Sequence, residues 1–80
     1  VYVVDDDLSV RTSLCALLSA HGYRAAAFAS AEDFLPSLDE DRVLCVFVDL
    51  RMNGMNGMAL LKLLQERDKT IPVVILTAHG

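Results

Sequence analysis

Short apolar runs alternate along this chain with longer segments of mixed polarity. Three runs are clear, Val1–Val4, Val43–Val48 and Val73–Leu76, and a weaker, alanine-rich one lies at Tyr23–Phe28. Apolar runs of this length, without polar alternation, are typical of parallel strands that are buried on both faces. The segments between them place apolar residues three and four positions apart, which predicts amphipathic helices. The predicted order is therefore strand–helix–strand–helix–strand–helix–strand.

The first predicted helix covers Leu8–Ala20. Asp7 or Ser9 can cap its start, because a side-chain oxygen there accepts from the free N–H groups of the first turn. Gly22 is well placed to end the helix, since glycine readily adopts the left-handed conformation that follows many helices. The apolar side of this helix comprises Val10, Leu14, Leu17, Leu18 and His21.

The second predicted helix opens at Ser30, which serves as N-cap with Asp33 three positions later. Pro36 lies about six residues in and removes a helical hydrogen bond, so we expect a short or kinked helix. The third helix follows Asn56, a suitable N-cap, and ends near Arg67. The residues expected to face the core from these two helices are Phe34, Leu35, Leu38, Ala59, Leu60, Leu63 and Leu64.

The alternation of strands and helices predicts an α/β fold with an open parallel sheet. Right-handed crossovers would place helices on both faces of that sheet. Residues 1–4, 43–48 and 73–76 have the composition of core strands, whereas the alanine-rich 23–28 run suits an edge. The strand order 2-1-3-4 satisfies these preferences. Its switch point lies between the first and third strands, where open α/β sheets bind ligands.

Composition narrows the class of protein. The chain has 80 residues, a hydrophobic content of 54% and a net charge of −4, which fits one globular domain and argues against nucleic-acid binding by this segment. No apolar run approaches the ~20 residues of a membrane span. Cys15 and Cys45 lie far apart outside any metal or redox motif, and we expect free thiols in a cytoplasmic protein. The chain begins at Val1 and ends at Gly80 directly after a strand, so we expect a piece of a longer protein.

Polar residues follow three of the predicted strands. Asp5 and Asp6 follow the first strand, Asp49 the third and Thr77 the fourth. In a parallel sheet these positions share one rim, where crowded carboxylates raise one another's pKa values or need a compensating cation. A few oxygen ligands with open positions suit Mg²⁺. A magnesium ion beside a carboxylate is what phosphoryl transfer to an aspartate requires, and a hydroxyl there can hydrogen-bond a phosphoryl oxygen.

Simpler interpretations stand beside this one. In these interpretations, the run Asp5–Asp7 is no more than a solvated helix cap. Asp49 is simply a turn residue, and Thr77 is simply the last residue of a strand. An EF-hand is excluded, because no glycine or terminal glutamate falls at the required positions. An aspartyl-phosphate phosphohydrolase is disfavoured, since its general acid would stand where this chain has Arg51. A protein-interaction module that never meets phosphate remains an alternative.

Three motifs resemble a known family. They are VVDD at Val3–Asp6, VDLRM at Val48–Met52 with MNG at Met55–Gly57, and LTAHG at Leu76–Gly80. Together they resemble the receiver domain of bacterial two-component response regulators, most of all FixJ-type regulators, whose receivers precede a LuxR-type helix-turn-helix. The resemblance implies a flavodoxin-like receiver fold, of which residues 1–80 are the N-terminal part, with the fifth strand and the last helices missing.

The resemblance also implies a role for each matching residue. Asp49 would be the phosphoacceptor. Mg²⁺ would be bound by Asp49, by Asp6 directly, by Asp5 mainly through water and by the backbone carbonyl of Arg51. Two further contacts to the phosphoryl group would come from the switch hydroxyl of Thr77 and the backbone N–H of Ala78.

The family resemblance further implies interaction partners, and the chain also differs from the family pattern in two respects. A phosphohistidine on a sensor histidine kinase would donate the phosphoryl group, and DNA would be contacted only through a C-terminal domain outside this chain. The receiver would assist its own phosphorylation without being a turnover enzyme. Asn53 stands where the family usually has proline, and the family's final lysine is not among these residues. Separately from the resemblance, a chain that ended at Gly80 would leave the edge of strand 73–76 exposed, and we would then expect a homodimer through this edge and the helix after it, an exchange of elements between chains, or aggregation.

Overall fold

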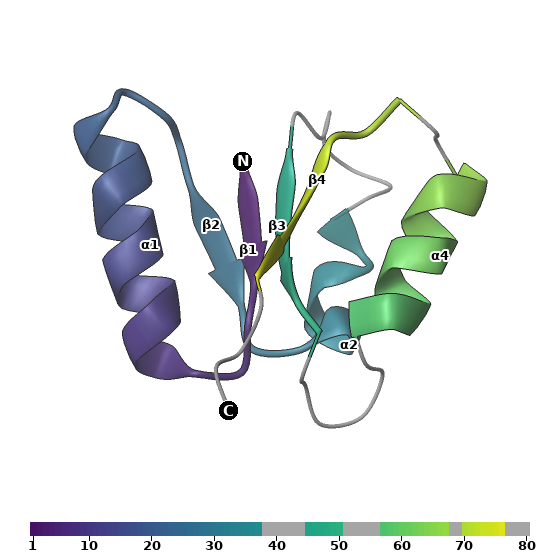
Figure 1. Cartoon of the computed structure of the whole chain (residues 1–80). Coiled ribbons are helices and arrows are strands. Elements are labelled where there is room, and N and C mark those ends of the chain that lie inside the picture. The colour runs from purple at the N-terminus through teal and green to yellow at the C-terminus, as the bar shows by residue number, and fades with distance from the viewer. Residues whose placement is uncertain (38–44, 51–56, 68–69, 77–80) are drawn as a thin grey trace.

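The computed structural model describes residues 1–37, 45–50, 57–67 and 70–76. Its elements follow the predicted strand–helix alternation, and helices cover both faces of the sheet (Figure 1). Helix α1 lies on one face, whereas α2 and α4 lie on the other. The elements in chain order are β1 (Tyr2–Val4), α1 (Leu8–Ala20), β2 (Ala26–Phe28), α2 (Ala31–Phe34), β3 (Val46–Asp49), α4 (Gly57–Arg67) and β4 (Val73–Leu76).

The sheet has the predicted order, β2-β1-β3-β4, and every neighbouring pair of strands is parallel. Strand β1 pairs with β3 so that Tyr2 lies opposite Val46 and Val4 opposite Val48. The chain crosses from β2 on one side of β1 to β3 on the other, so the switch point falls between β1 and β3. The prediction of an open parallel α/β sheet is confirmed.

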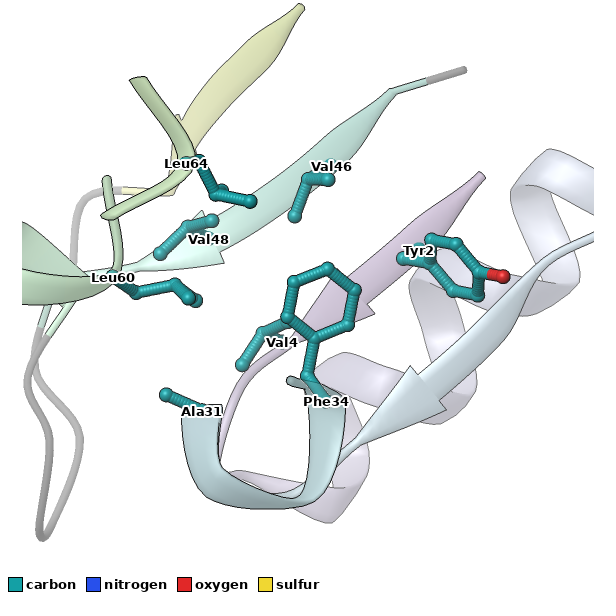
Figure 2. Close-up of a cluster of buried hydrophobic side chains, with 8 residues drawn as sticks. All are labelled: Tyr2, Val4, Ala31, Phe34, Val46, Val48, Leu60 and Leu64. Atoms are coloured by element: carbon teal, nitrogen blue, oxygen red, sulfur yellow. The ribbon is translucent and has the colours of Figure 1, made fainter. Parts of the chain in front are cut away.

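The main hydrophobic core lies between the sheet and the pair of helices α2 and α4. Figure 2 shows side chains from β1 and β3 meeting those of the two helices. The aromatic rings of Tyr2, Phe28 and Phe34 pack in tilted pairs with centroids 5.4–5.7 Å apart. Tilted packing suits the ring quadrupoles and adds to the stabilisation from burial. The buried members of the core are Tyr2, Val4, Ala31, Phe34, Val46, Val48, Leu60 and Leu64.

Helix α1 has the predicted bounds and caps. The Asp7 side chain accepts from the backbone N–H groups of Ser9 and Val10, so Asp7 rather than Ser9 is the N-cap. Gly22 follows the helix with φ +87°, the left-handed conformation that glycine adopts easily. The described part of the chain does not bury the apolar side of this helix. No residue of α1 is buried, and Leu17 is 55% exposed.

Helix α2 is short, as the position of Pro36 predicts. Ser30 is its N-cap and accepts from the Asp33 backbone N–H at 3.1 Å. Phe34 from α2 and Leu60 from α4 are fully buried, in agreement with their predicted core positions. The predicted cap Asn56 and the core candidate Leu38 lie outside the described residues.

Three strand predictions need correction. Strand β2 begins at Ala26 rather than Tyr23, because the Tyr23 N–H donates to the Leu18 carbonyl and so belongs to the end of α1. Strand β3 runs from Val46 through Asp49, since Asp49 still pairs with β4. Strand β4 has the predicted bounds but is not buried on both faces, because Val74 is 41% exposed.

Cys15 and Cys45 are both free and only half buried. Within the described part of the chain, no helix combines the length and the apolar character needed to cross a membrane.

Candidate metal and phosphoacceptor site

The carboxyl ends of β1 and β3 place two acids side by side. Val4 and Val48 are register partners, so the residues that follow them, Asp5 and Asp49, leave the two strands at the same level. Both side chains are buried, Asp5 at 4% exposure and Asp49 at 7%, whereas Asp6 is exposed. Buried carboxylates are uncommon unless they are paired or bind metal, so this position calls for a chemical explanation.

A third acid completes the group. One carboxylate oxygen from each of Asp5, Asp6 and Asp49 can be chosen so that all three lie within 4.8 Å of one another. We call these three residues the acidic cluster. The cluster lies at the topological switch point of the sheet, where open α/β folds bind ligands.

The carboxylates of the acidic cluster repel one another, and this repulsion affects the pKa of Asp5. Burial raises the pKa of the Asp5 carboxyl above its ordinary value, and the negative charges of Asp49, Asp6 and Asp7 raise it further. The Asp7 backbone N–H opposes this shift, because it donates to the Asp5 Oδ1 at 2.8 Å and so favours the charged form. A bound cation would relieve the remaining repulsion.

The turn between β1 and α1 holds the cluster in place through a chain of hydrogen bonds. The Asp5 side chain accepts from Asp7, and the Asp7 side chain accepts from Ser9 and Val10. The Arg11 Nη1 donates to the backbone carbonyl of Asp5 at 2.8 Å. The sequence analysis gave Arg11 no role at this site. The available signal was its position one turn after the N-cap, from which a long side chain can reach back to the preceding turn.

Gly57, the first residue of α4, packs against the backbone at the carboxyl end of β3. A Cβ at this position would collide with the Asp49 carbonyl oxygen and would lie 2.6 Å from the Leu50 Cα. Helix α4 can therefore approach the carboxyl end of β3 this closely only with glycine at its start. The sequence analysis used Gly57 as part of a motif and missed this steric role, which depends on how α4 packs against β3.

The donor set fits a hard divalent cation. Its three carboxylates offer oxygen ligands only, and oxygen ligands are what Mg²⁺ and Ca²⁺ prefer over softer metals. The acidic cluster is therefore a pocket that could bind a metal ion. The predicted site residues Arg51, Thr77 and Ala78 lie outside the described residues. Leu76, which precedes Thr77 in the sequence, is the register partner of Asp49.

An open parallel α/β sheet with acids gathered at its switch point defines a flavodoxin-like protein with an acidic ligand site. The particular family follows from comparison with known proteins. The family model described as "Response regulator receiver domain" matches residues 1–80. The chain therefore belongs to the receiver domains of two-component response regulators, as its motifs predicted.

Two curated relatives are transcriptional regulators. The chain is similar to the DNA-binding transcriptional regulator NtrC of Proteus hauseri, with 40% identity over 80 residues that make up all of this chain and 17% of the relative. It is also similar to the transcriptional regulatory protein FixJ of Bradyrhizobium diazoefficiens, with 39% identity over 80 residues and 39% of the relative. The chain thus spans well under half the length of these relatives.

A solved structure supports the fold. The response regulator protein TrrA from Thermotoga maritima, determined in complex with Mg²⁺-BeF, superposes with a TM-score of 0.91 at 25% identity. The match covers 99% of this chain and 69% of that one.

Proposed function

We propose that this receiver accepts a phosphoryl group on Asp49 with the help of Mg²⁺. The observation on which this proposal rests is the convergence of Asp5, Asp6 and Asp49 at the carboxyl ends of β1 and β3, within 4.8 Å of one another. Their mutual repulsion favours a bound cation, and the TrrA structure contains magnesium together with beryllofluoride. The remaining roles are proposed by analogy with the receiver family.

The residues that would hold the ion are Asp5, Asp6, Asp49 and the backbone carbonyl of Arg51. When bound, Mg²⁺ would neutralise the oxygens of the incoming phosphoryl group, so that an anionic carboxylate can approach it. Asp6 is the exposed member and is suited to bind the ion directly, whereas the buried Asp5 is held by Asp7 and suits contact through water.

In the proposed reaction, one carboxylate oxygen of Asp49 attacks the phosphorus of a phosphohistidine. A new O–P bond forms as the P–N bond breaks, and its electron pair returns to the imidazole nitrogen of the donor. Burial at the end of β3 fixes the direction of the Asp49 side chain and lowers the entropic cost of reaching the in-line geometry. The Thr77 hydroxyl and the Ala78 backbone N–H would donate to the transferred phosphoryl oxygens.

The product would act as a switch. Phosphorylation adds about −1.5 to −2 charges at the rim of the sheet and draws Thr77 towards it, which biases the domain between two arrangements. The donor would be a sensor histidine kinase, and the response would pass to a transcriptional output domain like those of NtrC and FixJ. We further propose that the protein is cytoplasmic and that it assists its own phosphorylation without being a turnover enzyme. It would form a homodimer through the β4 edge.

The test uses the intact protein, Mg²⁺ and acetyl phosphate. Intact-mass spectrometry should show a phosphoryl adduct that hydroxylamine removes, as expected of an acyl phosphate. Asp49→Asn should abolish the adduct. Asp33→Asn, which makes the same change on an exposed residue of α2, should leave it unchanged. An adduct that persists in Asp49→Asn, or none in the unmodified protein with either acetyl phosphate or beryllofluoride, would contradict the proposal.

A further inference from the structure

Arg11 joins helix α1 to the strand end that carries the acidic cluster. It is the fourth residue of α1, and its backbone N–H donates to the Asp7 carbonyl at 3.1 Å, at the start of the helix. Its side chain turns back, and Nη1 donates to the Asp5 carbonyl at 2.8 Å in a partly buried setting. One residue thus contacts the turn through both its main chain and its side chain.

The turn is fixed at successive points as a result. The carbonyl of Asp5 is held by Arg11 and its carboxylate by the Asp7 N–H, while the Asp7 carboxylate is held by Ser9 and Val10. Asp6 lies between two residues whose backbones are both tied to α1. The direction in which its side chain leaves the turn therefore depends on these hydrogen bonds.

The hydrogen bond of Arg11 goes to a main-chain carbonyl rather than to a carboxylate. A guanidinium group that paired with a carboxylate of the cluster would compete with a metal ion for that ligand. Bonding to the carbonyl instead fixes the backbone and still satisfies a charged donor. In many metal-binding proteins, side chains that do not contact the metal orient its ligands through hydrogen bonds of this kind.

We propose that Arg11 is a positioning residue of the metal site, which sets the placement of Asp5 and Asp6 by holding the Asp5 carbonyl against α1. The inference rests on the proposed function, because it assumes that the acidic cluster binds Mg²⁺. It assigns Arg11 no contact with the ion or with the phosphoryl group.

Removing Arg11 takes away both a charge and a positioning contact. These two losses should change the Mg²⁺ affinity in opposite directions, which makes the proposal testable. Charge alone predicts tighter Mg²⁺ binding in Arg11→Gln, because a positive group that repels the ion is gone. Loss of positioning predicts weaker binding, and outer-shell substitutions typically cost 10–100-fold in metal affinity. We expect the dissociation constant for Mg²⁺ to rise about 10-fold.

The experiment is isothermal titration of the intact protein with Mg²⁺ alone, without a phosphoryl donor. Arg11→Gln is compared with Arg24→Gln, which removes the same charge from an exposed arginine just before β2, at the opposite end of the sheet. Arg24→Gln should bind like the unmodified protein. Arg11→Lys keeps the charge but presents one compact donor on a flexible stem, so it should weaken binding by a smaller factor than Arg11→Gln.

A kinetic measurement separates positioning from general damage to the fold. With acetyl phosphate as donor, the Mg²⁺ concentration that gives half the maximal phosphorylation rate should rise in Arg11→Gln by the same factor as the dissociation constant. The rate at saturating Mg²⁺ should stay near that of the unmodified protein. A fall in the saturated rate with an unchanged half-saturating concentration would overturn the proposal.

The remaining outcomes are also decisive. Equal or tighter Mg²⁺ binding by Arg11→Gln would overturn the role of Arg11 and leave the proposed function intact. Absence of Mg²⁺ binding by the unmodified protein would overturn both. If circular dichroism shows that Arg11→Gln is unfolded, Arg11→Lys decides: weaker binding at unchanged net charge supports positioning, and equal or tighter binding contradicts it.

Discussion

Gly57→Ala tests whether the close approach of α4 to β3 sets the position of Asp49. Gly57 is buried, and an added Cβ would meet backbone atoms rather than the movable end of a side chain. It would lie 2.6 Å from the Leu50 Cα and 2.8 Å from the Asp49 carbonyl carbon, and it would collide with the Asp49 carbonyl oxygen. Either the start of α4 or the end of β3 must move.

The size of the effect follows from these contacts. Carbon atoms in contact ordinarily lie ~3.5–4.0 Å apart, so relieving the 2.6 Å contact to Leu50 requires a shift of roughly 1 Å. Forcing an extra methyl into a packed site usually costs about 1–3 kcal/mol. Alanine is the better helix former by up to ~1 kcal/mol, though less so at the first helical position. We expect a net loss of about 1–2 kcal/mol in the free energy of unfolding.

The assay pairs stability with function. Urea denaturation followed by circular dichroism gives the free energy of unfolding, and the acetyl phosphate reaction gives the rate of Asp49 phosphorylation. Gly22→Ala is the matched control, because it adds the same methyl at a position with no atom within 4 Å but with φ +87°. Its left-handed backbone should cost about 1–2 kcal/mol. The two variants thus lose similar stability, and only Gly57→Ala should slow phosphorylation.

Two results would refute this reasoning. If Gly57→Ala unfolds at the same urea concentration as the unmodified protein, the backbone contact at the start of α4 does not constrain the structure. If Gly57→Ala and Gly22→Ala slow phosphorylation equally, then global stability rather than the placement of Asp49 governs the rate.

Two further predictions concern charge and packing. Because the pKa of Asp5 is raised in the fold, the native state keeps a proton over a pH range in which the unfolded chain has lost it. Without metal, stability should therefore fall as pH rises through the raised pKa, and Asp5→Asn should flatten this fall in melts with EDTA; a steeper fall would contradict the sign. Phe34→Ala, at a fully buried position, should cost about 3–5 kcal/mol by urea denaturation, and Leu17→Ala, at 55% exposure, well under half as much; equal costs would contradict the assigned core.

Much of the fold was predictable because local pattern and topology agree. Apolar runs without alternation marked the strands, and the composition of residues 23–28 marked the edge strand that is now β2. The bounds of α1 followed from Asp7 and Gly22, since both ends depend on contacts within a few residues. The rule that carboxyl ends of parallel strands share one rim then brought Asp5 and Asp49 together.

What the sequence could not predict depends on distant contacts or on side-chain reach. The exposure of Leu17 and Val74 depends on which elements cover each face of the sheet, and periodicity reports only that an apolar side exists. The return of the Arg11 side chain to the Asp5 carbonyl depends on a rotamer, and rotamers leave no periodic signal. The need for glycine at position 57 depends on the distance between α4 and β3, which only the packed structure defines.

The two missed residues act on opposite sides of the same site. Arg11 ties the Asp5 carbonyl to α1 on one face of the sheet, and Gly57 lets α4 pack against Asp49 from the other face (Figure 1). The strand ends that carry the carboxylates are therefore held by helices on both faces, and these strand ends cannot separate without moving one of the helices. Repulsion that geometry prevents from relaxing must be relieved by protonation or by a cation, and the raised pKa of Asp5 is the first of these responses. At neutral pH a divalent ion would supply the second, so the rigidity of the scaffold favours metal binding at the proposed phosphorylation site.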